Sequence, residues 1–321
     1  MRSSLRRTLV GCLVVVALGL GWVAGSSTRT GPGAALAQGA SVGQMMADAM
    51  KEAEVVDLTV LISEQMPAHW PAHAPFQRWT FNWFKPVKGA YGDNLAQSVF
   101  PYYGQRVVID DHTGTQTDCP AHFIPPPGSG MPFESPVGLT TCDKVDPARW
   151  MGPAAVIDVR AILDQADNGK SPVITPKMVQ DWEAANGALQ PGEIVVFHSG
   201  YTDRYYKPFP EGNRLAFEPL ILKSAPGWPA PSPETMEYLH SKGIQHLAID
   251  SPSMGYVEGG QPTHVAGLKY GMTWDEQVIN VGRLPARGAF YVSLNAKIVD
   301  GSGGITRAVA IKNRGQRGIG E

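Results

Sequence analysis

Short runs of apolar and β-branched residues recur along most of the chain, and polar or glycine-rich segments separate them. Runs of this composition are typical of strands in a buried sheet. The predicted strands cover residues 55–62, 107–118, 154–159, 193–198, 244–250, 289–294 and 308–312. The pattern therefore predicts a protein whose framework is a β-sheet.

Two segments carry the start and stop signals of a helix. Residues 175–187 and 232–242 each begin with a hydroxyl side chain, Thr175 or Ser232, that is followed by proline. A hydroxyl residue caps the free N–H groups of a first turn, and proline fits the first helical position. Glycine closes both segments, so we predict one helix in each.

Two further segments lack a clear period. Residues 38–54 predict a short helix or a loose linker, and residues 66–94, which are rich in proline and tryptophan, predict a long ordered loop. Trp70, Trp79 and Trp83 in that loop line a pocket or pack beneath the loop. Strands thus alternate with few helices, and no repeat of 20 to 50 residues is visible. We predict a single α/β domain with a mixed sheet, not a regular doubly wound fold.

The first residues have the pattern of an export signal. Arg2, Arg6 and Arg7 precede an apolar run at 9–24, which is a little short for a membrane-spanning helix. Ala35-Leu36-Ala37 then matches a signal-peptidase cleavage site. We predict a signal peptide at residues 1–37 and export to the periplasm or the extracellular space; the alternative is an uncleaved anchor.

Composition and charge exclude some classes of function. The chain is 43% apolar and 17% charged, with a formal net charge of −2. No basic patch stands out, so we expect no binding to nucleic acid or to a membrane surface.

Only two of the three cysteines, Cys119 and Cys142, follow the predicted signal. Export permits a disulfide, but a domain of this size does not need one, and Cys119 lies inside a polar motif. We predict two free or buried thiols.

The densest polar chemistry lies between His112 and His122. In an extended strand, residues two apart share a face, so His112, Gln116 and Asp118 are predicted to point the same way, with Gly114 leaving space between them. Imidazole and carboxylate groups are ligands of divalent metals. The alternative is a polar strand face with a hydrogen-bonded aspartate and a surface histidine.

This segment resembles the H-x-G-T-H-x-D-x-P-x-H signature of the metal-dependent cyclase and kynurenine formamidase family. The residues in register are His112, Gly114, Thr115, Asp118, Pro120 and His122. Similar segments occur at 56–59, 69–71 and 248–253, and His264 precedes Glu276 by the family's spacing of twelve residues. The resemblance covers about residues 55–312, which is far more than one motif.

The resemblance implies a swivelling β/β/α fold with a barrel-like sheet over residues 55–315. It implies one or two divalent ions, Mn or Zn, held by the side chains of His112, Gln116, Asp118, His264 and Glu276. Because Asp275 adjoins Glu276, an error of one residue in the register would exchange them. The resemblance also makes His122 the general acid and base, and Trp70 a contact of the substrate. His198 follows a strand; it lines the pocket or serves a structural role.

One position departs from the signature. The family's second histidine is Gln116 in this chain. Glutamine coordinates through its carbonyl oxygen, which is a weaker and harder ligand than imidazole. The change shifts the expected preference from Zn towards Mn, or from two ions to one.

Together with the predicted signal peptide, the resemblance predicts an exported hydrolase of a small, aromatic substrate. The bond cleaved is a C–N bond of a formamide, amide or cyclic amide, or a lactone bond, and a metal-bound hydroxide attacks it while His122 moves the proton. We expect a homodimer or homotetramer. The alternative is a non-catalytic exported protein that binds a small molecule at a degenerate metal site.

Overall fold

The structure is a computed structural model that describes residues 41–98 and 100–321. The signal peptide predicted at 1–37 lies outside these residues. Within this part of the chain, every helix is too short or too polar to cross a bilayer.

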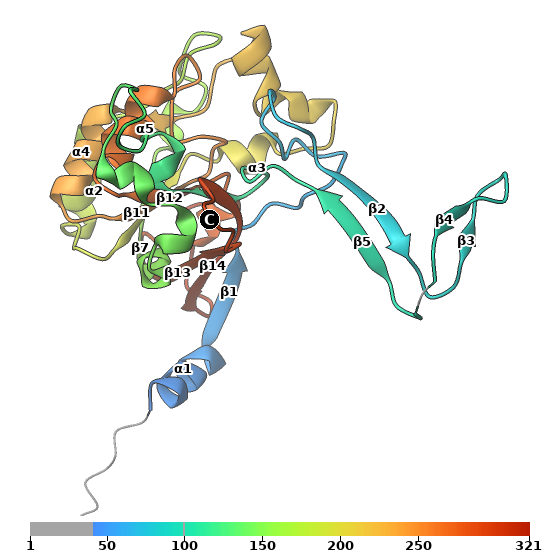
Figure 1. Cartoon of the computed structure of the whole chain (residues 1–321). Coiled ribbons are helices and arrows are strands. Elements are labelled where there is room, and N and C mark those ends of the chain that lie inside the picture. The colour runs from blue at the N-terminus through green and yellow to red at the C-terminus, as the bar shows by residue number, and fades with distance from the viewer. Residues whose placement is uncertain (1–40, 99) are drawn as a thin grey trace, which may run out of the picture. The chain divides into compact units, whose positions relative to one another are not determined.

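The main sheet has eight strands, seven of which close into a barrel (Figure 1). The strands are β1 (Ala53–Asp57), β14 (Gly303–Asn313), β13 (Arg287–Asn295), β7 (Met151–Asp158), β9 (Ile194–His198), β11 (His246–Ile249), β12 (Thr273–Glu276) and β6 (Gln116–Asp118), in spatial order. The short strand β6 pairs with both β12 and β14 and closes the barrel, while β1 pairs with β14 outside it. Strands β7, β9, β11 and β12 are parallel to one another, and the other pairings are antiparallel. The predicted mixed, barrel-like sheet is confirmed.

Alternation along the parallel strands creates two apolar layers. Ala154 and Val156 face the barrel interior, whereas Ala155 and Ile157 pack on the outer side. Three helices supply the outer layer (Figure 1). They are α2 (Pro176–Asn186), α4 (Pro233–Ser241) and α5 (Gln261–Leu268). These strands are apolar on both faces because both faces are covered, and each large aliphatic side chain buried there contributes about 1.5–3 kcal/mol.

Both predicted helices are present. Helix α2 begins at Pro176, and Gly187, with a φ of 89°, follows its last residue. Helix α4 begins at Pro233, where the Ser232 side chain accepts a hydrogen bond from the Thr235 N–H. Helix α1 (Val42–Lys51) occupies part of the segment predicted as a short helix or linker.

The sequence did not predict three further elements. They are α3 (Tyr201–Tyr205), α5 and β12. Six of the eight residues of α5 are buried, and all four of β12 are buried. A helix buried on most sides shows little amphipathic period, and the sequence of β12, Thr-Trp-Asp-Glu, contains no apolar run, so neither gives the usual signal.

Part of the predicted loop at 66–94 is β-structure. Strands β2 (Gln77–Asn82) and β5 (Gly104–Val108) form an antiparallel ribbon that is separate from the main sheet, and β3 (Val87–Lys88) pairs with β4 (Asn94–Ala96) (Figure 1). Short β8 (Val173–Ile174) pairs with β10 (Ala230–Pro231). The remaining short helices are Pro120–His122, Pro136–Leu139, Cys142–Lys144, Pro147–Trp150, Arg160–Ile162, Glu211–Arg214, Phe217–Leu222 and Val281–Arg283.

The predicted strand at 107–118 is interrupted. Strand β5 ends at Val108 and β6 begins at Gln116, with a turn between them. Gly114 has a φ of 70°, in the left-handed region that favours glycine, and a Cβ there would meet the Ile62 side chain at 3.0 Å. The chain therefore bends where a continuous strand was expected.

The prediction of two free or buried thiols is wrong. Cys119 and Cys142 form a disulfide with a Cα–Cα distance of 5.4 Å, and both residues are buried. The sequence pattern did not show that residues 120–122 fold back on the segment around Thr140, where the Ala121 N–H donates to the Thr140 carbonyl at 3.2 Å. This folding brings the two cysteines together and ties the end of β6 to the segment that follows.

Candidate metal centre

Strand β6 places Gln116 and Asp118 on one face, two residues apart. In the ladder with β12, Gln116 lies opposite Glu276 and Asp118 lies opposite Trp274. Gln116 Nε2 donates to Glu276 Oε2 at 2.9 Å. The side chain of Asp275 points the other way, into the barrel, where it accepts from Thr117 and Tyr291. The register therefore assigns Glu276, and not Asp275, to the polar cluster.

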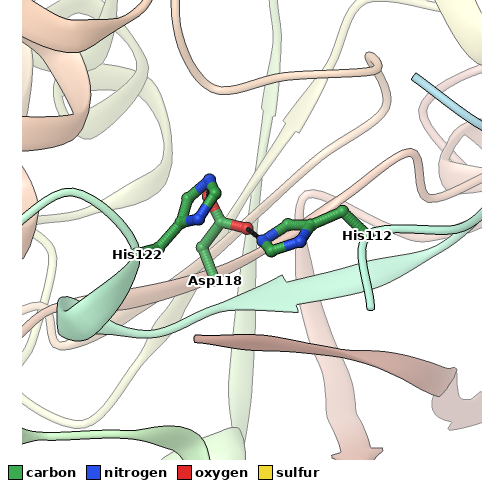
Figure 2. Close-up of side chains that lie close together, drawn as sticks. All are labelled: His112, Asp118 and His122. Atoms are coloured by element: carbon green, nitrogen blue, oxygen red, sulfur yellow. Dashed lines mark ion pairs between the residues drawn. The ribbon is translucent and has the colours of Figure 1, made fainter. Parts of the chain in front are cut away.

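His112 reaches the cluster from the turn before β6. The expectation that it shares a strand face with Gln116 and Asp118 is wrong, because residues 109–115 are not a strand. Its Nε2 nevertheless lies 3.3 Å from Asp118 Oδ1 (Figure 2). On the other side of the ring, Nδ1 donates to Asp111 Oδ1 at 2.7 Å. A carboxylate on one ring nitrogen leaves the other nitrogen to bind a metal.

His122 lies close to both Asp118 and His112 (Figure 2). The short helix Pro120–His122 turns it back towards β6, so that its Nε2 lies 3.8 Å from Asp118 Oδ2. Its ring stacks on that of His112 with 4.1 Å between centroids.

Helix α5 supplies His264. Its Nδ1 donates to the Gly260 carbonyl at 2.8 Å, so Nε2 is the atom that faces the carboxylates. That Nε2 lies 3.4 Å from Asp118 Oδ2 and 3.5 Å from Glu276 Oε1. Three segments distant in sequence thus meet at Asp118.

The donor atoms of the cluster fit a divalent cation. Among the described residues, His112 Nε2, Gln116 Oε1 and Asp118 Oδ1 are buried and have no hydrogen-bond partner. Buried polar atoms without partners are rare in folded proteins, and bound ions are a common reason for them. Three groups of side chains have spacing suited to an ion: His112, Asp118 and His122; Asp118, His264 and Glu276; and Asp110, Asp111 and His112. The first two share Asp118, which gives room for one ion or two at that carboxylate.

The predicted ligand histidines have raised pKa values. Burial alone would lower the pKa of His112, but the nearby carboxylates of Asp111 and Asp118 outweigh burial and raise the pKa to about 11. Burial likewise opposes protonation of His264, yet Asp118 and Glu276 raise its pKa to about 10. Both rings are held where a positive charge is favourable.

His122 behaves in the opposite way. Burial is the largest cause that lowers the pKa of His122, and the nearby His112 and His264 lower it further. The pKa falls to about 4, although Asp118 opposes the shift. Burial and the neighbouring Asp118 raise the pKa of Glu276. Burial would also raise the pKa of Asp118, but the surrounding histidines outweigh it and hold that pKa well below its usual range. His122 is therefore neutral at pH 7 and can accept a proton.

A cavity of about 410 Å³ opens beside the cluster. Its lining includes the predicted residues Trp70, His112, Gln116, His122, His264 and Glu276. The fully buried Asp118 lies behind them. Trp70 rests edge-on against Trp228, with 5.7 Å between ring centroids.

His198 lies outside the described lining of this cavity. Its Nδ1 donates to Asp250 Oδ2 at 2.8 Å, and the residue borders a separate depression with Arg160 and Arg283. Sequence position at a strand end did not show which way this side chain points.

Three supporting residues escaped the sequence analysis. Asp111 orients His112, and its position next to that histidine was the available signal. Phe123 packs its ring 4.2 Å from that of His264. Trp274 Nε1 donates to Asp118 Oδ2 at 3.1 Å and to Glu276 Oε1 at 3.2 Å, a contact that only the β6–β12 register reveals.

Comparison with known proteins gives consistent matches. The profile of the family described as putative cyclase matches residues 56–256. An isatin hydrolase from Roseibium aggregatum is 29% identical over 212 residues, which are 64% of this chain and 73% of that protein.

Solved structures share the fold. Isatin hydrolase A from Labrenzia aggregata, bound to benzyl benzoate, superimposes with a TM-score of 0.67 at 20% identity, covering 86% of this chain and all of that chain. A predicted metal-dependent hydrolase from Bacillus stearothermophilus gives a TM-score of 0.53 at 20% identity and covers 81% of this chain and 99% of that chain.

Proposed function

This chain belongs to the putative cyclase family, and from that premise we propose that it is a metal-dependent hydrolase of a small, aromatic substrate. The bond cleaved is the C–N bond of a cyclic amide, an amide or a formamide, or else a lactone bond. The observation that carries the proposal is the set of three unpartnered buried donor atoms on His112, Gln116 and Asp118 beside an open cavity.

We assign five residues to binding of the cation and one residue to proton transfer. His112, Gln116, Asp118, His264 and Glu276 would hold the cation. A divalent cation at this place polarises a carbonyl oxygen and lowers the pKa of water. His122, neutral at pH 7, accepts a proton from the attacking water and returns it to the leaving nitrogen or oxygen. In sum, the carbonyl carbon gains the oxygen of water while its bond to the leaving atom breaks.

Cyclic amides of aromatic rings are the favoured substrates. The relative from Roseibium aggregatum is an isatin hydrolase. The cavity volume of about 410 Å³ suits a compound of that size, and Trp70 and Phe123 supply flat apolar surfaces.

The proposed enzyme is exported. The disulfide between Cys119 and Cys142 supports this setting, because disulfides persist mainly in oxidising compartments. The predicted signal at 1–37 agrees with it.

We also infer that it assembles as a homodimer or homotetramer. Several large apolar side chains are exposed on the segment that carries β2 to β5, and such surfaces mark interaction sites. They include Trp79, Phe84, Tyr91, Phe100 and Tyr102.

The test of the proposed reaction is a panel of neutral substrates. The purified protein, supplied with Mn²⁺, is mixed with isatin, formanilide or an aromatic lactone, and ring opening or aniline release is followed by absorbance. We expect turnover of isatin at least, and no turnover by the Asp118→Asn variant. Failure of the wild-type protein to hydrolyse any of the three compounds would favour the alternative, a binding protein.

A further inference from the structure

The apolar wall of the cavity belongs to one packed cluster. Trp70, Leu215, Leu220, Tyr256 and Val257 all line the cavity. All five also belong to a hydrophobic cluster around the fully buried Trp228, distinct from the barrel interior and from the layer beneath the helices. This wall is therefore fixed by packing and offers a substrate ring little besides apolar surface.

Lysine and arginine are missing from the described lining of this cavity. Burial and the neighbouring His73 lower the pKa of His69, which disfavours a positive charge on that ring. The other basic side chains of the described lining are His73, whose Nδ1 lies 3.1 Å from Asp110 Oδ1, and the histidines of the metal centre.

Glu258 places a negative charge at the apolar wall. It follows Val257 directly, lines the cavity and is exposed to solvent. Its Oε2 accepts a hydrogen bond from the Ser171 N–H at 3.0 Å, which holds the carboxylate in place. A substrate group at this wall meets apolar atoms and one anion.

We propose that this cavity selects ring substrates that carry no negative charge away from the bond to be cleaved, and that Glu258 strengthens the selection. An anionic substituent at the wall would lose its bound water without gaining a partner, and Glu258 would repel it. A neutral substituent of equal size would lose little binding free energy at the same place. The inference rests on the proposed hydrolase function and names the charge class of its substrates.

Three isatins of matched shape test the selection. They are isatin, the neutral isatin-5-sulfonamide and the anionic isatin-5-sulfonate, whose substituents lie para to the ring nitrogen and far from the amide bond. For the wild-type protein with Mn²⁺, we expect kcat/KM for the sulfonate to be about 100-fold below that for the sulfonamide. Equal values for the two compounds would overturn the proposal.

A second experiment reverses the charge of residue 258. We expect Glu258→Lys to raise the ratio of sulfonate to sulfonamide kcat/KM by about 10-fold at low ionic strength, and added salt should reduce the effect. The control Glu52→Lys makes the same change of charge at an exposed residue outside the cavity lining, and its ratio should stay at the wild-type value. An unchanged ratio in Glu258→Lys would remove that residue from the proposal.

Measurements of binding distinguish a failure of the charge selection from a failure of the proposed hydrolase function. Quenching of tryptophan fluorescence gives the affinity of each compound without turnover. If no compound is hydrolysed but the sulfonamide binds about 100-fold more tightly than the sulfonate, the hydrolase proposal fails and the charge selection stands. If the two bind equally, or neither binds, the charge selection fails.

Discussion

The three histidines of the cluster differ in what surrounds each ring. His112 and His264 each donate from Nδ1 to a fixed acceptor and direct Nε2 at carboxylates, and their pKa values are raised. The ring of His122 donates to no such fixed acceptor among the described residues, and its pKa is lowered to about 4. At the scale of single residues, this separates metal ligands from a proton acceptor.

We expect His122→Gln to keep bound metal and to lose about 10³-fold in kcat, because glutamine cannot accept a proton. Metal content by mass spectrometry and kcat on isatin check this. In the wild type, activity should fall as the pH drops towards the pKa of His122, since the protonated ring is no longer a base. A variant as active as the wild type would contradict the acid–base role.

Metal uptake should depend on pH. In the metal-free protein His112 and His264 are protonated at pH 7, because their pKa values are about 11 and 10. A metal binds only the neutral rings, so uptake releases protons and affinity rises with pH, by between about 10-fold and 100-fold per pH unit. Titration calorimetry in buffers of different ionisation enthalpy measures the protons released. An affinity that is constant from pH 6 to pH 8 would contradict the ligand assignment.

Gln116 should set the choice of metal. We expect Gln116→His to raise the affinity for Zn²⁺ relative to Mn²⁺ by about 10-fold or more, because imidazole replaces a hard oxygen donor. Competition of the two ions for the protein, read by metal analysis, gives the ratio. Gln261→His is the matched control, since Gln261 lines the cavity but is an exposed residue at the start of α5. An equal shift in both variants would show that Gln116 is not a ligand.

At the scale of elements, the pairing of β6 with β12 builds the site. On one side of this pair the ladder brings Gln116 to Glu276, and on the other it brings Thr117 to Asp275. Asp275 is fully buried, and His246 and the hydrogen bonds that the residue accepts outweigh burial and lower its pKa. This interior network fixes the register that positions the ligands.

We expect Thr117→Val to lower the free energy of unfolding by about 1–3 kcal/mol, because buried Asp275 loses one donor without gaining another. Urea unfolding followed by tryptophan fluorescence measures the change. Thr80→Val, a change in the separate ribbon, should alter stability by less than about 0.5 kcal/mol. Equal losses in the two variants would show that the network does not stabilise the barrel.

Sequence patterns predicted the elements whose residues alternate or carry caps, such as β7, α2 and α4. They missed α5 and β12, which are buried and lack a simple period. They also extended one strand through Gly114, whose positive φ belongs to a turn. The site residues near Asp118 were identified by their resemblance to a family motif, while the supporting contacts from Asp111 and Trp274 depend on tertiary register.

At the scale of the whole molecule, the disulfide joins the end of β6 to the segment 136–144. It closes a loop with a sequence separation of 23 residues, and both sulfur-bearing residues are buried. Because Cys119 lies between Asp118 and His122 in sequence, the bond restrains the segment that carries both. It therefore supports the site as well as the fold.

We expect Cys119→Ala combined with Cys142→Ala to lower the free energy of unfolding by about 2–4 kcal/mol, because the unfolded chain regains the freedom of that loop. Urea denaturation with and without reductant gives the measurement. Reductant should destabilise the wild type to a similar extent and leave the double variant unchanged. Identical stability of the two proteins without reductant would contradict a structural disulfide.

The central claim is that the cluster around Asp118 holds the cation on which hydrolysis depends. Its most direct test is a titration in which Mn²⁺ is added to chelator-treated protein while bound metal and isatin hydrolysis are measured on the same samples. We expect turnover to rise with metal and to level off at one or two ions per chain, and Asp118→Asn to bind none. Full turnover without bound metal, or binding that Asp118→Asn leaves intact, would contradict the claim.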